Sequence, residues 1–222
     1  MMFCIAIDGP AGSGKSTISK MLAKELNFTN IDTGALYRAI AYYFSRENID
    51  PNTINIENEL EHIKIDVHNE NFEQQIFLND VNITDKIRTE KISKLASECS
   101  KNILVREYLL GLQRDLARKS NTVIDGRDIG TVVVPNADVK IFLTASPETR
   151  ARRRYLELKL KDPNVNYEDI LKDIKNRDTQ DMNRELSPLK ITPDYIKVDN
   201  TEYNLEETVK IMLDVIKRSI KI

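Results

Sequence analysis

An α/β fold, with a five-stranded parallel sheet flanked by helices, is the architecture that the sequence predicts. Five short apolar runs predict buried strands, and long helical patterns separate most of them, at residues 3–7, 28–31, 122–124, 139–143 and 195–198. Alternating strands and helices indicate a parallel sheet with helices on both faces. Charged, glycine-containing motifs follow the first three runs, and the carboxyl ends of such strands are where ligands bind.

The composition predicts one globular domain, or a core with small insertions. The chain has 222 residues, 41% of them hydrophobic, and a net charge of −2, so it can form a full hydrophobic core. So small a charge disfavours a nucleic-acid or membrane surface, and no apolar run could span a bilayer. The first residues lack the basic region of a signal peptide. Cys4 and Cys99 have no zinc-site spacing, which favours two free thiols in a reducing cytoplasm.

The first strand leads into GPAGSGKS at residues 9–16, which fits the phosphate-loop pattern and opens a predicted helix. The glycines let backbone N–H groups surround phosphate oxygens, and the helix N-terminus adds a positive dipole. Lys15 should reach the β- and γ-phosphates, and Ser16 should bind Mg²⁺. A glycine-rich turn with a chance lysine is the structural alternative. The residues expected to hold the nucleotide are Gly9, Pro10, Ala11, Gly12, Ser13, Gly14, Lys15, Ser16 and Thr17.

The second strand leads into DTGALYRA, and a small insert follows the next helix. Asp32 or Thr33 could cap that helix. Arg38 lies one to two turns further along an otherwise apolar stretch, so it points towards an anion or reaches solvent. Beyond the helix, apolar residues alternate in IKIDV, and QIFLNDVNI follows with a candidate turn at Asn79-Asp80. This pattern predicts an antiparallel insert.

The third strand ends in Asp125, a carboxylate that could orient Mg²⁺ or merely cap a turn. The motif DGRDIGTVV then places Arg127 and Asp128 opposite the phosphate loop. Arg127 suits a phosphate and Asp128 suits an exocyclic amine, whereas a mutual surface ion pair is the plainer alternative. Upstream, Ser97 and Arg106 lie nine residues apart on a predicted helical stretch, and the residues alone assign neither a function.

A helical hairpin is predicted after the fourth strand. Ser146 suits an N-cap with Pro147 at the first helical position. A basic helix follows, DPNVN interrupts it, and a second helix from about residue 167 carries RDTQDMNR. In that octet Arg177, Asp181 and Arg184 project from one face and could hold a phosphate and a sugar, although most such charged runs are solvated. The residues expected to face water are Thr179, Gln180 and Asn183.

These motifs, with IFLTAS between them, closely resemble the bacterial cytidylate kinases in order and spacing, nearly end to end. The resemblance implies a P-loop nucleoside monophosphate kinase that transfers the γ-phosphoryl group of ATP, with Mg²⁺, to CMP or dCMP. It implies a core at residues 1–36, 97–146 and 186–222, a monophosphate-binding domain with the antiparallel insert at 37–96, and a mobile helical lid at 147–185. A monomer without nucleic-acid or membrane partners is the family expectation.

The resemblance also implies a function for each motif residue. Acceptor-phosphate binding is implied for Arg38, Arg127 and Arg184. Cytosine recognition is implied for Ser97, Arg106 and Asp128. Arg177 and Asp181 would contact the ribose, with Arg177 also near the phosphates, and Thr33 would join the substrate-binding residues. Arg153 would lie near the adenine of ATP, with Arg150 and Arg154 as neighbouring alternatives.

The chemistry that this resemblance implies agrees with the residues present. A phosphate acceptor is already ionised, so catalysis needs positioning and charge neutralisation, with Mg²⁺, by Lys15, Arg127, Arg177 and Arg184. A kinase that phosphorylates a hydroxyl needs a general base, and Asp32 keeps that small-molecule kinase open as an alternative. A nucleotide-binding switch is a second alternative, disfavoured because no segment resembles a switch.

Overall fold

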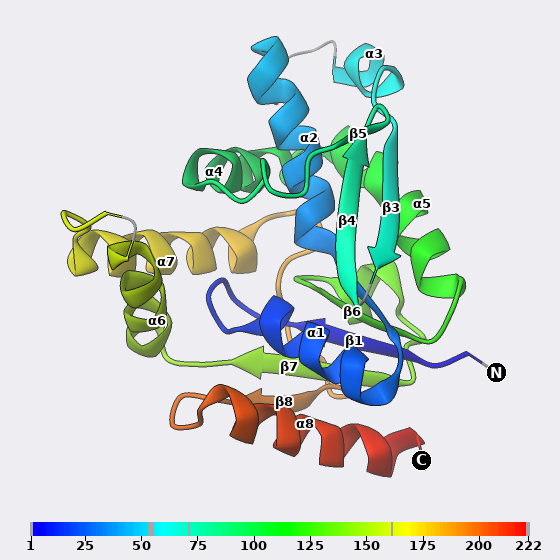
Figure 1. Cartoon of the computed structure of the whole chain (residues 1–222), viewed down its shortest axis with the longest axis vertical. Coiled ribbons are helices and arrows are strands. Elements are labelled where there is room, and N and C mark those ends of the chain that lie inside the picture. Colours follow the sequence, from blue (N-terminus) through cyan, green and yellow to red (C-terminus); the bar gives the residue numbers. More distant parts are fainter. Residues whose placement is uncertain (1, 53–55, 71, 161, 221–222) are drawn as a thin grey trace.

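A five-stranded parallel sheet forms the centre of the computed structural model, which describes residues 2–52, 56–70, 72–160 and 162–220 (Figure 1). The strand order is β2-β6-β1-β7-β8, so the first strand lies in the middle. All four strand pairs are parallel. The strands are β1 (Cys4–Asp8), β2 (Thr29–Asp32), β6 (Thr122–Gly126), β7 (Val139–Thr144) and β8 (Ile196–Asp199). Each begins at the predicted residue or one residue later, so the predicted sheet is confirmed.

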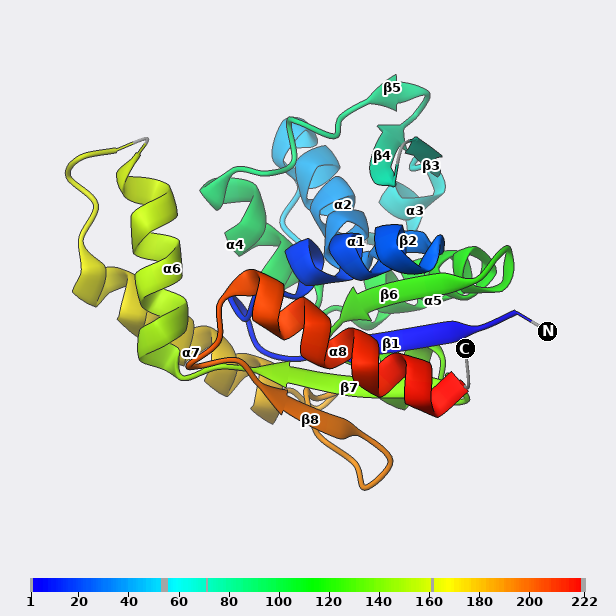
Figure 2. The ribbon, with the colours of Figure 1, turned by 60° about the horizontal axis from the view of Figure 1, so that its bottom comes forward.

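Helices cover both faces of this sheet, which is why its central strands are continuous apolar runs. On one face α1 (Lys15–Leu26) and α8 (Leu205–Ile220) bury Leu22 and Met212 against Ile7 (Figure 2). On the other face α2 (Thr33–Glu47) and α5 (Ile103–Arg118) bury Phe44 and Leu109 in a second cluster. The two clusters hold the carboxyl end of each strand in a fixed position.

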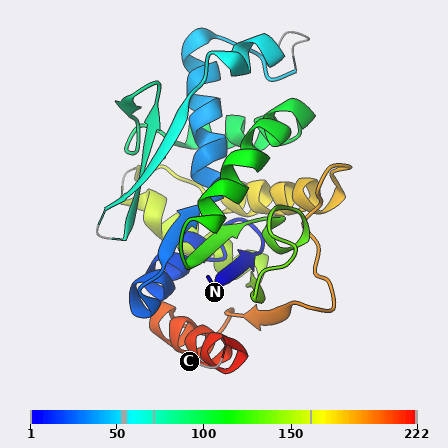
Figure 3. The ribbon, with the colours of Figure 1, turned by 90° about the vertical axis from the view of Figure 1, so that its right-hand side faces the viewer.

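The predicted insert is a separate antiparallel sheet on the side of the molecule opposite α8 (Figure 3). It follows α3 (Ile56–Glu61) and consists of β3 (Ile65–Glu70), β4 (Glu73–Leu78) and β5 (Val81–Asn82). Asn79 and Asp80 have positive φ angles of 47° and 64° between β4 and β5. Two successive positive φ angles match the right-handed twist of a hairpin, so the turn predicted at these residues is confirmed.

The helical stretch predicted to carry both Ser97 and Arg106 is in fact two helices. The first, α4 (Glu90–Cys99), ends before Ser100, and α5 begins after Asn102. The Asn102 side chain accepts hydrogen bonds from the backbone N–H groups of Leu104 and Val105. This local cap starts a new helix, so Ser97 and Arg106 belong to different elements.

The hairpin predicted after the fourth strand is confirmed as α6 (Pro147–Lys159) and α7 (Tyr167–Asn183). Ser146 caps α6 by accepting a hydrogen bond from the backbone N–H of Thr149 at 3.2 Å, and Pro147 takes the first helical position. Ala151 and Ile174 pack the two helices together. Figure 1 shows the hairpin beyond the carboxyl end of β7. No helix in the described part of the chain is long and apolar enough to cross a membrane.

Two glycines provide a matched test of this architecture. A Cβ at Gly9, where φ is 153°, would lie 2.0 Å from the carbonyl oxygen of Leu143, whereas a Cβ at exposed Gly111 would meet nothing within 4 Å. Gly9→Ala should therefore lower the free energy of unfolding by about 2 kcal/mol or more. Gly111→Ala, inside α5, should raise it by about 0.5–1 kcal/mol. Urea unfolding measures both, and an unchanged midpoint for Gly9→Ala would contradict the close packing of β1 and β7.

Candidate active site

A cleft of about 940 Å³ lies where the phosphate loop, the start of α2, α4, the end of β6 and α7 converge. Most residues singled out in the sequence line this cleft. They include Lys15, Ser16, Thr33, Arg38, Ser97, Arg106, Asp125, Arg127, Asp128, Arg177, Asp181 and Arg184. Arg153 is not among its lining residues. The structure thus brings together residues from elements far apart in the sequence.

The phosphate loop joins β1 to α1 and surrounds the amine of Lys15. Gly12 and Gly14 have φ angles of 75° and 89°, a left-handed backbone that glycine adopts readily. The Lys15 Nζ donates to the carbonyl oxygen of Pro10 at 2.7 Å and to the Ser13 Oγ at 3.3 Å. Burial and the guanidinium of Arg127 hold the pKa of Lys15 well below its usual value. An anion bound in the loop would reverse that effect.

Ser16 and Asp125, the predicted metal-binding pair, are in contact. The Ser16 hydroxyl donates to Asp125 Oδ2 at 3.0 Å, and the other carboxylate oxygen, Oδ1, is buried without a described partner. Burial and the neighbouring Asp32 carboxylate raise the pKa of Asp125 to about 7. A buried carboxylate oxygen with no partner costs free energy, so the site favours a cation here.

Asp32, rather than Thr33, caps α2. Its Oδ1 accepts a hydrogen bond from the backbone N–H of Ala35 at 3.1 Å, and its Oδ2 accepts one from Arg38 at 2.8 Å. The Thr33 hydroxyl instead donates to the carbonyl oxygen of Asp125 at 2.7 Å. Arg38 is therefore turned into the cleft rather than to bulk solvent, and both oxygens of the Asp32 carboxylate are occupied.

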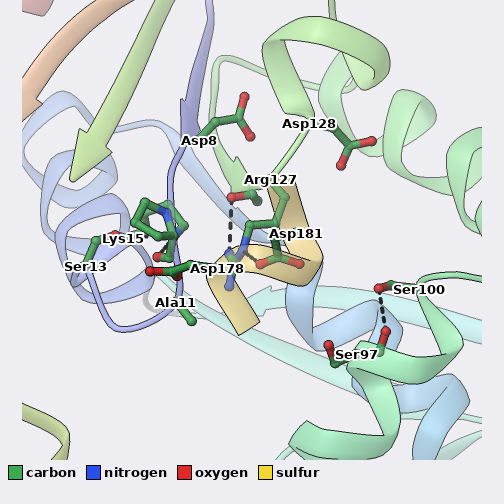
Figure 4. Close-up of polar contacts among 12 residues, drawn as sticks. Asp8, Ala11, Ser13, Lys15, Ser97, Ser100, Arg127, Asp128, Asp178 and Asp181 are labelled. Atoms are coloured by element: carbon green, nitrogen blue, oxygen red, sulfur yellow. Dashed lines mark hydrogen bonds and ion pairs between the residues drawn. The ribbon is translucent and has the colours of Figure 1, made fainter. Parts of the chain in front are cut away.

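Arg127 and Asp128 do not pair with each other, so the plainer reading of these neighbours is wrong. The Arg127 Nε donates to Asp181 at 2.9 Å, whereas Asp128 pairs closely with Arg106 and lies 3.5 Å from an Arg184 nitrogen. Figure 4 shows Arg127 beside Asp181, with Asp128 turned to the other side. The side chains of Arg127 and Asp128 therefore line the same cleft but contact different partners.

The octet RDTQDMNR divides much as predicted. Arg177, Asp181 and Arg184 line the cleft, although Arg184 follows the last helical residue with an extended backbone. Thr179 and Asn183 are exposed, as expected. Gln180 is exposed too, yet its side chain lines the cleft mouth, which corrects the expectation that it faces only water.

Arg177 has a guanidinium that no described residue neutralises by an ion pair. It has no hydrogen bond to any described residue, and its Nε is buried. Burial, together with the nearby guanidinium of Arg127, lowers the pKa of Arg177 to about 10. Although burial alone would raise it, the pKa of Asp181 is lowered by Arg127 and Arg177, so this carboxylate stays ionised. An unpaired, partly buried cation of this kind favours an anionic ligand.

The three neighbouring arginines of α6 have three different environments. Arg150 is buried, contacts the phosphate loop through the carbonyl oxygen of Ala11 at 2.9 Å, and pairs with Asp178 at 2.6 and 3.0 Å. Arg153 donates to Asn200 and Tyr203, in the loop between β8 and α8. Arg154 lines the cleft and pairs with Glu90 at 2.6 Å. No local pattern predicts that Arg150 is buried against Asp178.

Sequence reasoning also missed Asp8, the last residue of β1. Its buried carboxylate accepts hydrogen bonds from the N–H groups of Ile129 and Gly130 at 2.8 and 2.9 Å, and from the Tyr195 hydroxyl at 2.5 Å. Burial raises the pKa of Asp8 despite these partners. These bonds fix η1 (Ile129–Val133), a short π-helix, directly after Arg127 and Asp128. The signal available in the sequence was the position of Asp8, a carboxylate at the end of a strand that is otherwise apolar.

The described residues contain no cluster of three or more His, Cys, Asp or Glu side chains that could hold a metal unaided. A cation at Ser16 and Asp125 would therefore take further oxygen ligands from nucleotide phosphates and water. A phosphate loop after the middle strand, facing a cleft rich in arginine, is the arrangement of the P-loop kinases. The fold and the site together place the chain in that class.

Comparison with known proteins narrows the class. The cytidylate kinase family matches residues 5–218. A cytidylate kinase of Fervidobacterium nodosum is 43% identical over 222 residues, which is 100% of both chains. Another, of Carboxydothermus hydrogenoformans, is 49% identical over 217 residues, covering 96% of this chain and 97% of that protein. The chain therefore belongs to the cytidylate kinase family.

A solved structure of low sequence similarity shares the fold. An uncharacterized protein from Eubacterium ventriosum has a TM-score of 0.53 at 15% identity, covering 98% of this chain and 99% of that one. At this identity the likeness concerns the fold alone.

The unpaired guanidinium of Arg177 leads to a testable expectation. Arg177→Met removes a partly buried charge that has no ion-pair partner among the described residues, so the ligand-free protein should become more stable by about 1 kcal/mol. Inorganic phosphate should stabilise the wild-type protein more than this variant. Thermal unfolding with and without phosphate measures both effects, and Lys172→Met, at an exposed position of the same helix, is the control. A loss of ligand-free stability in Arg177→Met alone would contradict the analysis.

Proposed function

We propose that this enzyme transfers the γ-phosphoryl group of ATP to CMP or dCMP, giving ADP and CDP or dCDP. Membership of the cytidylate kinase family supports the reaction. The observation that carries it is Arg177, a partly buried cation that lines the cleft together with Lys15 and forms no ion pair with a described residue. A cleft with a phosphate loop at one end and arginines at the other fits two phosphorylated ligands that meet between them.

The donor nucleotide would bind through the phosphate loop. Backbone N–H groups of residues 9–17 other than Pro10, together with the N-terminus of α1, would hold the phosphate oxygens. Lys15 would exchange its present partners, Pro10 and Ser13, for the β- and γ-phosphates. Arg153 would lie beside the adenine. Its guanidinium donates to the backbone carbonyl oxygen of Asn200, and the Asn200 side chain donates to the Ser13 carbonyl oxygen in the phosphate loop.

Ser16 and Asp125 would hold a Mg²⁺ ion, and the residues present fit it. Their hydroxyl and carboxylate oxygens are the hard ligands that Mg²⁺ prefers, and Asp125 Oδ1 is buried without a described partner. When bound, the ion would neutralise charge on the nucleotide phosphates. The raised pKa of Asp125, which follows from burial and from Asp32, would fall once a cation lies beside it.

The acceptor phosphate would be held by Arg38, Arg127 and Arg184, with Arg177 between donor and acceptor. Each of these guanidiniums lines the cleft. Because the attacking group is a phosphate oxygen that is already ionised, no residue needs to remove a proton from it. The rate enhancement would come from alignment of the two phosphates and from neutralisation of the charge between them.

Cytosine would be read at the far end of the cleft. Asp128 and Arg106 pair closely and line the cleft with Ser97. A carboxylate acceptor beside a guanidinium donor complements the exocyclic amine and the adjoining acceptor atoms of cytosine. On the sugar, ionised Asp181 and Thr33 would accept or donate hydrogen bonds. The ion pairs of Asp128 with Arg106 and of Asp181 with Arg127 would hold these carboxylates in place until the nucleotide binds.

The alternative, phosphorylation of a small-molecule hydroxyl with Asp32 as base, is not favoured. A base needs a free oxygen within reach of the substrate proton, but both oxygens of Asp32 are bonded, to Ala35 and to Arg38. Family membership points the same way. Asp32 is better explained as a cap that also orients Arg38.

A lid movement would complete the site. We propose that residues 147–185 close over a core of residues 1–36, 97–146 and 186–222, opposite the monophosphate-binding residues 37–96. Exposed ion pairs already join the lid to α4, at Arg154–Glu90 and Lys94–Asp173. Closure would exclude water from the γ-phosphate and limit ATP hydrolysis. A monomer in the reducing cytoplasm suits the unpaired thiols of Cys4 and Cys99.

The acceptor panel is the direct test of the reaction. With ATP and Mg²⁺, coupled measurement of ADP release should give turnover with CMP or dCMP that exceeds turnover with UMP, AMP and shikimate. The reason is that Asp128 and Arg106 complement cytosine. Heat-inactivated enzyme and omission of the acceptor are the controls. A preference for AMP or for shikimate would contradict the proposed function.

Asp128→Ala tests the proposed base site separately. The variant should raise KM for CMP about tenfold or more and KM for ATP less than about twofold, because it removes one hydrogen-bonded charge from the acceptor end only. Asp115→Ala, at an exposed aspartate on α5, is the control and should change neither constant. Equal increases in both KM values would contradict the assignment of Asp128 to the base.

A further inference from the structure

A buried glutamine of the antiparallel insert reaches the acceptor side of the cleft. Gln74 lies on β4, and its side chain is buried. Its Oε1 accepts a hydrogen bond from the backbone N–H of Asp32 at 2.6 Å, and its Nε2 donates to the Asp32 carbonyl oxygen at 3.2 Å. One side-chain amide therefore satisfies both backbone polar groups of a residue 42 positions away.

The place of Asp32 in the sheet explains why this contact is needed. Asp32 is the last residue of β2, an edge strand, and its neighbour on the other side is Asp125 of β6. An edge strand leaves backbone N–H and C=O groups without a neighbouring strand, and burying them unpaired is costly. An amide side chain carries the same donor and acceptor as a peptide group. Gln74 thus substitutes for one residue of a missing strand.

Asp32 in turn orients two side chains of the acceptor site. Its carboxylate caps α2 and accepts a hydrogen bond from Arg38 at 2.8 Å. The next residue, Thr33, donates its hydroxyl to the carbonyl oxygen of Asp125. Since Arg38 Nε is buried without a described partner, the Asp32 carboxylate is the contact that directs this guanidinium. A shift of the Asp32 backbone would therefore move Arg38 and Thr33.

We propose that Gln74 is a positioning residue for the acceptor nucleotide, acting through Asp32 on Arg38 and Thr33. The inference rests on the proposed function, and it gives the insert a part in substrate binding without contact to substrate, since Gln74 does not line the cleft. The donor side should be independent of it. The amine of Lys15 is held by Pro10 and Ser13, which belong to the phosphate loop itself.

Steady-state kinetics of Gln74→Met test the proposal, because methionine has a similar size but neither the amide donor nor the amide acceptor. KM for CMP should rise about tenfold, whereas KM for ATP should change by less than about twofold. The matched control is Glu73→Gln, at the preceding residue of β4. It removes only the exposed ion pair with Lys20 and should leave both KM values within about twofold of wild type.

The possible outcomes separate this inference from the proposed function. A wild-type protein that fails to phosphorylate CMP contradicts the proposed function. An active wild type together with a Gln74→Met enzyme whose two KM values are unchanged, or rise equally, overturns the inference alone. If Gln74→Met does not fold, Gln74→Glu, which keeps an acceptor but loses the donor, is compared in the same way. Failure of both variants to fold overturns the inference, because Gln74 would then serve the fold rather than the acceptor site.

Discussion

The guanidinium of Arg177, which has no ion-pair partner among the described residues of a partly buried cleft, is the constraint on which the rest of this structure depends. Burial and the nearby guanidinium of Arg127 both disfavour the charge of Arg177, and no described carboxylate forms an ion pair with it. Burying an unpaired cation is unfavourable in the absence of ligand. The fold tolerates the arrangement because most side chains of the two hydrophobic clusters lie away from the cleft and supply stability independently of its charges. Binding of phosphate groups then removes a cost already present in the free protein.

The ion pairs of the ligand-free cleft are better explained by positioning than by stability. A partly buried ion pair contributes little net stability, because desolvation offsets much of the attraction. Arg127 with Asp181 and Arg106 with Asp128 nevertheless both line the cleft. Each pair limits the conformations of a long side chain before substrate arrives, so less conformational entropy is lost on binding. The same contacts also leave a carboxylate in each pair that can accept a hydrogen bond from a nucleotide.

The sequence predicted the parts of the fold that are governed by local patterns. Apolar runs and the glycine spacing of the phosphate loop determine the strands and the first turn, so their bounds were found to within one or two residues. The break between α4 and α5 was missed because the Asn102 cap outweighs a continuous helical pattern. Two other features depend on partners that only the tertiary fold brings together. Arg127 and Asp128 turn to different partners, and Gln74 contacts Asp32. No spacing in a single sequence reports such pairs.

The helical hairpin proposed as a lid is attached firmly at its base, beside the phosphate loop, and weakly where it meets α4. At the base, buried Arg150 joins Asp178 of α7 to the Ala11 carbonyl oxygen in the phosphate loop, and breaking a buried pair leaves an uncompensated charge. Further along the two helices, the contacts with α4 are exposed pairs, at Arg154–Glu90 and Lys94–Asp173, each worth about 1 kcal/mol or less. The proposed opening would therefore separate the helices from α4 while Arg150 stays attached to the phosphate loop. Such a movement would admit the acceptor nucleotide without disturbing the loop that is proposed to hold the donor.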